Sequence, residues 1–358
     1  MHKYTHILPA DAGLLTGRTI MAGPCSAESR EQVLTTAEQI ARRGMADIYR
    51  AGVWKPRTHP GCFEGIGVRA LEWLAEARIV TGLPVATEVA VPGHVAAAAE
   101  VGIDVLWIGA RTCANPFAVQ ELADAIASYC PQTPVLVKNP VSPDLELWIG
   151  ALQRLQRAGV AHLGAIHRGF SVYKSAPYRN APIWQLPLEL HRRFPSLPLL
   201  HDPSHTGGSR DHIAVLSQQA LDMGFTGLMI ECHTDPSSAL SDGGQQLTPD
   251  SLFNMLSALK VRSGDVPDRI LQGLRGQIDD IDNQLLGLLA RRMELSDSIG
   301  ECKRRADMPV VQTERYSRLL TSLVGRGVEL GLDEAFLAGL LERIHAESVR
   351  RQLEIVSH

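Results

Sequence analysis

The sequence predicts an α/β fold, a (β/α)8 TIM barrel, followed by a smaller all-α domain. Eight short, mostly apolar runs alternate with helical segments over the first 260 residues, and no strand signal follows them. Strands of this kind form a parallel sheet with helices on its outer face. Eight such units favour a closed barrel over an open, doubly wound sheet. A dinucleotide-binding fold is further disfavoured because no Gly-x-Gly-x-x-Gly fingerprint follows the first strand.

The expected strands are four to six residues long and bounded by turn or helix signals. They are Thr19–Ala22, Ala46–Ala51, Pro84–Glu88, Asp104–Ile108, Pro134–Lys138, His162–Ile166, Leu197–His201 and Thr226–Glu231. The expected helices are Ser29–Arg43, Glu64–Thr81, Gly93–Val101, Pro116–Tyr129, Leu145–Ala158, Ile183–Phe194, Arg210–Met223 and Pro249–Lys260. Ser29 is a candidate N-cap of the first helix, and Gly44 is a usual helix stop.

Residues 261–267 are short, polar and interrupted by Gly and Pro, which predicts a linker between a barrel of residues 1–260 and a helical domain of residues 268–358. Beyond it, leucines and isoleucines are spaced three, four or seven residues apart, which predicts one long helix from Asp268 to Arg305. Two more helices follow, Thr313–Leu330 and Asp333–Val356. The narrow apolar stripe is typical of a seam between chains, so we expect a homodimer, or a larger oligomer built from it.

Composition narrows the functional classes. At 358 residues the chain exceeds one ordinary domain, and its net charge of −4 predicts no general affinity for nucleic acid or an anionic membrane. The first residues lack the apolar core of a signal peptide, no run of 18 apolar residues occurs, and six cysteines show no disulfide-framework spacing. These features predict a cytoplasmic protein.

Chemically useful residues gather at the carboxyl ends of the expected strands, where a barrel places its active site. Cys25 follows the first strand, His205 follows the seventh, Glu231 ends the eighth and Asp242 lies in the loop behind it. One Cys or His after a strand is usually structural. A thiolate, an imidazole and two carboxylates on one rim instead form a donor set suited to Mn²⁺, Fe²⁺, Co²⁺ or Zn²⁺. The sequence therefore predicts a metal-dependent enzyme.

Basic residues fall on the same rim: Arg50, Lys55, Arg57, Arg111, Lys138 and Arg168. Solvated surface charge accounts for any one of them, but six cations at one mouth would repel one another without bound anions. Phosphate and carboxylate groups supply that compensation, and guanidinium groups bind them through two parallel hydrogen bonds.

Five motifs resemble the compact 3-deoxy-D-arabino-heptulosonate 7-phosphate (DAHP) synthases, over about residues 1–260. They are Gly23-Pro-Cys-Ser-Ala-Glu28, Lys55-Pro-Arg-Thr58, Ile108-Gly-Ala-Arg-Thr112, Asp202-Pro-Ser-His-Thr-Gly-Gly208 and Ala239-Leu-Ser-Asp242. That family condenses phosphoenolpyruvate with erythrose 4-phosphate at the start of aromatic amino-acid biosynthesis, the shikimate pathway. The resemblance implies a metal held by Cys25, His205, Glu231 and Asp242, a phosphoenolpyruvate site of Arg111, Lys138 and Arg168 with Arg50 and Lys55 beside them, and a sugar-phosphate site of Arg57 and Thr58.

The family's chemistry implies Lewis-acid polarisation of the sugar aldehyde, attack by C3 of phosphoenolpyruvate, and Lys55 as the catalytic proton donor. The rival is 3-deoxy-D-manno-octulosonate 8-phosphate synthase, which shares the barrel but uses arabinose 5-phosphate. Cys25 does not separate the two families. Lys55-Pro-Arg-Thr58 does, because the rival typically has Lys-Ala-Asn-Arg-Ser in that loop. The motif favours DAHP synthase.

A second set of polar residues lies in the helical domain: Arg275, Arg292, Lys303, Arg315, Ser348 and Gln352. On a helix, Arg292 and Lys303 lie within about 20° of one face, and Ser348 and Gln352 share a face. Arg275 and Arg292 point about 100° apart, so we do not expect both to serve one pocket within one subunit. The alternative for such residues is a solvated charged face.

Motifs in this domain resemble the all-helical chorismate mutases, over about residues 268–358. They are Leu274-Arg-Gly-Gln-Ile-Asp-Asp-Ile-Asp-Asn-Gln-Leu-Leu286, Leu288-Leu-Ala-Arg-Arg292, Gly300-Glu-Cys-Lys303 and Glu347-Ser-Val-Arg-Arg-Gln352. The family's intertwined dimer places a first-helix arginine in the partner's active site. The resemblance implies that Arg275, Arg292 and Arg315 bind the carboxylates of chorismate with help from Ser348, and that Lys303 and Gln352 donate to the ether oxygen in the Claisen rearrangement to prephenate.

Two positions depart from that pattern, because Gln312 and Tyr316 stand where the family has Asp and Glu. Two hypotheses follow: a bifunctional DAHP synthase and chorismate mutase, or a DAHP synthase whose helical domain only dimerises and senses chorismate or prephenate. DAHP lies several steps upstream of chorismate, so the fusion cannot pass product between the two sites. We therefore expect allosteric feedback on the barrel from a ligand bound near Arg292 and Lys303.

Overall fold

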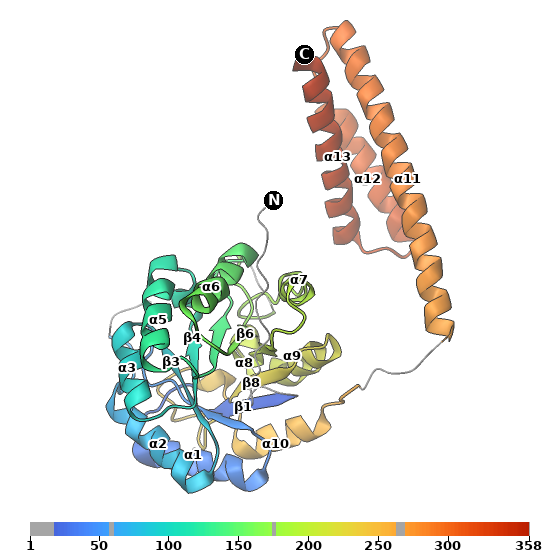
Figure 1. The fold of residues 1–358 in the computed structure, drawn as a ribbon. Helices are drawn as coiled ribbons and strands as arrows, with labels where there is room; N and C mark the ends of the chain where they lie inside the picture. Colours follow the sequence, from blue (N-terminus) through green and yellow to red (C-terminus); the bar gives the residue numbers. More distant parts are fainter. Residues whose placement is uncertain (1–17, 57–60, 174–176, 263–268, 358) are drawn as a thin grey trace. The chain divides into compact units, whose positions relative to one another are not determined.

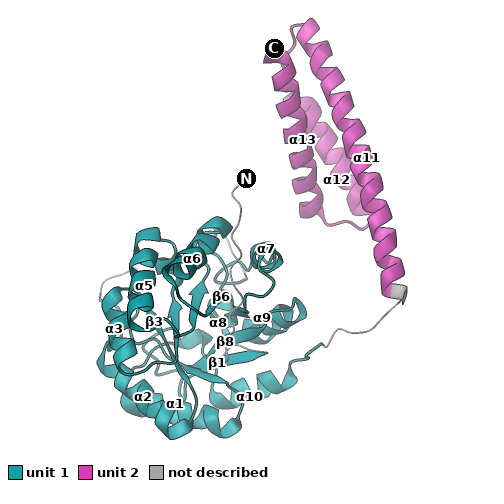
Figure 2. Cartoon of the chain, viewed as in Figure 1, with its two compact units in different colours: residues 1–263 teal, residues 264–358 magenta. Residues whose placement is uncertain are grey.

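The computed structural model describes residues 18–56, 61–173, 177–262 and 269–357. The chain divides into two compact units, Met1–Ser263 and Gly264–His358 (Figure 2). Among the described helices, none is long and apolar enough to cross a membrane.

The first unit is a closed barrel of eight parallel strands in sequence order, ringed by helices (Figure 1). The strands are β1 Thr19–Gly23, β2 Ile48–Arg50, β3 Val85–Val89, β4 Val105–Ile108, β5 Val135–Lys138, β6 Leu163–His167, β7 Leu199–His201 and β8 Gly227–Glu231. The predicted barrel is confirmed, and each expected strand is present with ends shifted by no more than two residues. Closure between β1 and β8 sets Gly23 opposite Glu231, so the loop that carries Cys25 begins beside Glu231.

Two apolar layers hold the barrel together. Side chains on alternate strand positions fill its interior: Met21, Ile48, Ala86, Val105, Trp107, Leu136, Ile166, Leu200 and Met229. A larger outer layer packs the opposite strand faces against the helices. Each fully buried large apolar side chain contributes about 1.5–3 kcal/mol to stability, so the barrel is a rigid support for the residues at its rim.

The helices of this unit are α1 Arg30–Arg43, α2 Arg69–Thr81, α3 Pro92–Glu100, α4 Ala110–Cys113, α5 Pro116–Tyr129, α6 Leu145–Ala158, α7 Gln185–Arg193, α8 Pro203–Gly207, α9 Arg210–Asp222 and α10 Pro249–Ala258, with the 3₁₀ turn η1 Gly243–Gln245. Ser29 caps α1 by accepting from the Gln32 backbone N–H, and Gly44 ends it at φ 60°, as predicted.

One expected helix boundary was wrong, and two short helices were not expected. Helix α2 begins at Arg69 rather than Glu64, because Gly65 and Gly67 adopt φ values of 99° and 77° and form a turn that a helix cannot contain. The short helices α4 and α8 were not predicted. They carry Arg111 and His205 to the barrel mouth directly after β4 and β7.

The second unit is all-helical, as predicted, with α11 Arg269–Arg305, α12 Thr313–Glu329 and α13 Glu334–Ser357. Along α11, an apolar stripe remains roughly half exposed in the single chain: Leu274, Ile278, Ile281, Leu285 and Leu288. Such a contiguous apolar surface is unusual for a monomeric domain.

Candidate active sites

Three predicted metal ligands meet at the barrel mouth. One ligand atom each from Cys25, Glu231 and Asp242 lies within 4.8 Å of the other two. Cys25 and Glu231 are fully buried, and the Cys25 Sγ lies 3.4 Å from Asp242 Oδ2. Asp242 reaches the site from an αL backbone conformation at φ 50°, which is uncommon for a residue other than Gly. The β1, β8 and loop positions are therefore brought together as the sequence predicted.

His205, the fourth predicted ligand, lies beside this cluster. Its Nε2 is 3.6 Å from Glu231 Oε1, and its Nδ1 is 2.8 Å from Asp202 Oδ2. The backbone N–H of His205 also donates to Asp202 Oδ1 at 3.0 Å, which fixes the first turn of α8. Asp202 was not predicted as a site residue, although its place at the end of β7 could have indicated one.

The electrostatics of this cluster favour a bound cation. Burial and, after it, the neighbouring Glu231 charge raise the pKa of the Cys25 thiol to about 12. Burial also acts to raise the pKa of Asp242, but His205 and Arg179 hold it below its usual value. A buried thiol next to two carboxylates becomes a thiolate when a positive charge joins it. Sulfur, nitrogen and oxygen donors in one place fit a borderline divalent ion.

Next to these ligands lies a hollow with a strongly basic lining. Its lining residues include Lys55, Arg111, Lys138, Arg168 and Arg179. Burial lowers the pKa of Arg168 to about 10, which still leaves it charged at neutral pH. Burial also acts to lower the pKa of Lys55, but Cys25 and Glu231 outweigh it and raise that pKa, so Lys55 carries a proton.

Arg50 has a different environment from the other predicted cations. It is buried, donates to Glu231 Oε1 at 3.0 Å and lies over the Trp107 ring at 4.7 Å. It is not among the residues that line the hollow. Arg57 and Thr58, the predicted sugar-phosphate ligands, lie outside the described residues.

Besides Asp202, two further polar residues of the mouth were missed by the sequence analysis. Arg179 lies in the loop after β6 and donates to Asp242 Oδ1 at 3.0 Å. Gln245 ends η1 and donates to Glu231 Oε2 at 2.7 Å. Neither follows a strand directly, so no spacing pattern marked them.

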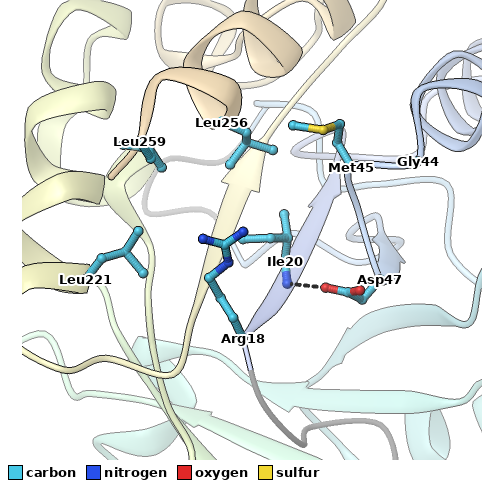
Figure 3. Close-up of a pocket in the computed structure, with 8 residues that line it drawn as sticks. All are labelled: Arg18, Ile20, Gly44, Met45, Asp47, Leu221, Leu256 and Leu259. Carbon is cyan, nitrogen blue, oxygen red and sulfur yellow. Dashed lines mark hydrogen bonds between the residues drawn. The ribbon is translucent and has the colours of Figure 1, made fainter. Parts of the chain in front are cut away.

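A separate hollow at the amino-terminal end of β1 lacks such chemistry (Figure 3). Its only charged lining residues among those described are Arg18 and Asp47, and the Asp47 carboxylate already accepts from the Ile20 backbone N–H at 2.7 Å. That end of a barrel usually serves stability rather than catalysis.

The helical unit contains its own pocket of about 440 Å³, a volume suited to a small molecule. Five of the six predicted residues line it: Arg292, Lys303, Arg315, Ser348 and Gln352. No carboxylate is among the described residues that line it, and Arg292, Lys303 and Arg315 give it a positive charge. Arg275 does not line it, which agrees with the prediction that Arg275 and Arg292 do not share a pocket within one chain.

Hydrogen bonds orient the polar side chains that line this pocket. Lys303 Nζ donates to Gln352 Oε1 at 3.0 Å, and Gln352 Nε2 donates to Ser296 Oγ at 2.9 Å. Tyr316 stacks on His345 with ring centroids 3.7 Å apart, and both line the pocket. Burial lowers the pKa of His345, and the nearby cations lower it further, so the imidazole is neutral.

Comparisons with known proteins agree with the two-unit architecture. Residues 12–265 match the model of the DAHP synthetase I family, and residues 274–353 match that of chorismate mutase type II. A phospho-2-dehydro-3-deoxyheptonate aldolase of Thermotoga maritima is 34% identical over 242 residues, which are 68% of this chain and 69% of the relative. A 2-dehydro-3-deoxyphosphooctonate aldolase of Nitratidesulfovibrio vulgaris is 31% identical over 69% of this chain and 93% of its own. The crystal structure of a Thermotoga maritima DAHP synthase superposes with a TM-score of 0.60 at 32% identity, covering 67% of each chain.

Proposed function

Because the chain belongs to the DAHP synthetase I family, we propose that its barrel condenses phosphoenolpyruvate with erythrose 4-phosphate at a divalent ion held by Cys25, His205, Glu231 and Asp242. With its chorismate mutase domain, the chain is a bifunctional enzyme of the shikimate pathway, a 3-deoxy-7-phosphoheptulonate synthase and a chorismate mutase. The single observation that supports the metal is the convergence of a thiol and two carboxylates within 4.8 Å beside His205.

The basic hollow supplies the phosphoenolpyruvate site. Arg111, Lys138 and Arg168 line it together and offer guanidinium and ammonium donors for one phosphate and one carboxylate. Lys138 is held in place by its ion pair with Asp202, at 2.7 Å. Arg50 does not line this hollow and acts indirectly, because it neutralises and orients Glu231 from inside the barrel.

The reaction forms one carbon–carbon bond, and at C2 of phosphoenolpyruvate it exchanges the bond to the phosphate oxygen for a bond to the oxygen of water. A divalent ion, when bound, supplies Lewis-acid polarisation of the aldehyde oxygen. C3 of phosphoenolpyruvate attacks C1 of erythrose 4-phosphate, and protonated Lys55 donates its proton to the aldehyde oxygen. Water adds at C2 and gives up one proton, which restores the charge of Lys55. Phosphate then leaves with the electron pair of the C2–O bond and takes the remaining proton of the C2 hydroxyl, so that C2 becomes a ketone. The charges of Arg111 and Arg168 favour that departure.

The sugar substrate separates this proposal from its rival. Relatives with about 30% identity include 2-dehydro-3-deoxyphosphooctonate aldolases as well as the heptonate enzyme. The Lys55-Pro-Arg-Thr58 motif supports erythrose 4-phosphate. Condensation rates with erythrose 4-phosphate and with arabinose 5-phosphate, measured as loss of phosphoenolpyruvate absorbance, decide between them. Faster turnover of the five-carbon sugar would promote the rival.

Metal dependence has its own experiment. Treatment with EDTA should abolish condensation, and Mn²⁺ or another divalent transition ion should restore it. Cys25→Ala should lose both metal and activity, because the thiolate is the softest ligand of the set. Full activity in metal-free buffer after exhaustive chelation contradicts the assignment.

For the helical unit, we propose that Arg292 and Arg315 bind the carboxylates of chorismate, with Ser348 beside them. Lys303 and Gln352 then donate to the ether oxygen as negative charge develops there. Preorganised donors of this kind are each worth about 10²–10³ in rate. The test is loss of chorismate absorbance with the purified full chain. No turnover at saturating chorismate would favour a sensing role, for which the replacement of the family's Glu by Tyr316 is the motivating observation.

We propose that the half-exposed stripe on α11 pairs with a second copy of this chain, and that Arg275 completes the partner's pocket. The exposure of five aliphatic side chains along α11 and the absence of Arg275 from its own pocket support this arrangement. We also propose that chorismate or prephenate in the helical pocket lowers the condensation rate of the barrel.

A further inference from the structure

A chain of hydrogen bonds joins two of the candidate metal ligands through residues that are not ligands themselves. One guanidinium nitrogen of Arg179 donates to Asp242 Oδ1 at 3.0 Å and to Gln245 Oε1 at 2.9 Å. The amide nitrogen of Gln245 in turn donates to Glu231 Oε2 at 2.7 Å. The path therefore runs from Asp242 through Arg179 and Gln245 to Glu231.

This path fixes the orientation of the Gln245 amide. Its oxygen faces Arg179, which is a donor only, so its NH₂ group must face Glu231. Gln245 is 2% exposed, so its amide group is shielded from water although the Arg179 side chain is 48% exposed. Glu231 is then held at both oxygens, by Gln245 at Oε2 and by Arg50 at Oε1.

The backbone around this path is also constrained. Gln245 N–H donates to the Asp242 carbonyl at 3.1 Å, so one 3₁₀ turn carries both the ligand and its orienting residue. Within that turn, a Cβ on Gly243 would lie 2.4 Å from the Pro236 carbonyl oxygen. On the other side, Arg179 N–H donates to the Gly207 carbonyl at 3.2 Å. The stem of Arg179 therefore starts from a fixed point at the end of α8.

We propose that Gln245, oriented by Arg179, is a positioning residue that presets Glu231 and Asp242 for a divalent ion. This inference rests on the proposed metal site and adds to it the residues that set its geometry. Groups that hydrogen-bond to metal ligands typically change metal affinity by about 10–100-fold when they are removed. The two carboxylates would otherwise take other rotamers and lose that preorganisation.

The experiment is a Co²⁺ titration of the metal-free, full-length protein, followed by the visible d–d absorption of the bound ion. Gln245→Leu removes the amide at similar size, and Arg179→Met removes the donor that orients it. We expect each to weaken Co²⁺ binding by about 10–100-fold. Gln218→Leu is the matched control, because Gln218 is a partly buried glutamine on α9 that bonds to Asp222 and to the Lys260 backbone, and to none of the candidate metal ligands. It should bind Co²⁺ like the parent.

The double variant tests whether the two residues act as one path. If Arg179 works through Gln245, the combined loss should be clearly smaller than the product of the two single losses. Thermal unfolding in EDTA shows which variants fold. If Gln245→Leu does not fold, the Co²⁺ affinity of Arg179→Met tests the proposal. The Arg179 side chain is 48% exposed, so we expect this variant to fold.

Each outcome has a separate meaning. Unchanged Co²⁺ affinity and an unchanged d–d spectrum in a folded Gln245→Leu or Arg179→Met variant overturn the positioning role while leaving the metal site standing. Independent, multiplicative losses overturn the path between the two residues. A parent protein that binds no Co²⁺ overturns the proposed metal site together with this inference.

Discussion

The ammonium group of Lys138 lies 2.7 Å from a carboxylate oxygen of Asp202, and both side chains are buried. The same oxygen lies 2.8 Å from His205 Nδ1. Burial alone would raise the pKa of Asp202, but His205 and Lys138 outweigh it and hold that pKa well below its usual value. One carboxylate thus supports a candidate phosphoenolpyruvate ligand and a candidate metal ligand.

Asp202→Asn should destabilise the barrel by about 3–5 kcal/mol, because it leaves a buried Lys138 charge without its partner. It should also lower kcat/KM for phosphoenolpyruvate. Urea unfolding and steady-state kinetics measure the two effects. Asp250→Asn is the control, because Asp250 pairs with Arg43 at the exposed surface, where such a pair is worth about 0–1 kcal/mol. Similar losses in both variants would contradict the role of Asp202.

The buried histidine pair at the carboxyl ends of β6 and β7 should make the barrel sensitive to acid. His167 Nδ1 and His201 Nδ1 are 3.1 Å apart, among Trp184 and Phe225. Burial lowers the pKa of His201 to about 4, whereas an unfolded histidine has a pKa of about 6.5. Between these values the unfolded chain binds more protons, so stability is present above about pH 6.5 and falls as the pH drops toward 4.

The loss from His201 alone should reach roughly 3 kcal/mol at about pH 4. Urea unfolding midpoints between pH 4 and pH 7 measure it, and His201→Phe should flatten the slope over this range. A replacement of His191 on α7, which is outside the pair, serves as the comparison. If the parent and His201→Phe show the same slope, the pair does not govern acid sensitivity.

Secondary-structure elements could be predicted from the sequence where their caps and apolar periodicity lie within one continuous segment. Helices α5 and α6 have the predicted bounds because Asn115 and Asp144 cap them and their apolar faces repeat over fourteen residues. Helices α4 and α8 were missed because four or five residues are too few to show a period. Gln245 was missed for another reason: its importance comes from Glu231 and Arg179, which only the closed barrel brings beside it.

Subunit exchange tests whether each mutase pocket combines two chains. Arg275→Ala and Arg292→Ala should each lose chorismate mutase activity as pure proteins. Refolded together in equal amounts, half of the dimers pair one chain of each kind, and one of their two pockets regains both arginines. The mixture should then show about a quarter of the parent activity.

An Arg292→Ala and Arg315→Ala mixture is the control and should stay inactive, because both residues line the pocket of the same chain. An inactive first mixture would place Arg275 outside the partner's pocket.

The two units catalyse distant steps of one pathway. We expect that they are joined because a ligand of the helical unit inhibits the barrel by feedback. Prephenate must bind one state of the full chain more tightly than the other, and a coupling of about 1–3 kcal/mol corresponds to roughly 5–150-fold. Prephenate should therefore slow condensation by the full chain, and Arg292→Ala should shift that response to much higher concentrations while its rate without effector stays unchanged. A chain that ends near Gly264 should not respond at all. Condensation rate against prephenate concentration for these three proteins is the measurement. Equal inhibition of the full and truncated chains would place the effector on the barrel, and no inhibition of the full chain would end the regulatory hypothesis.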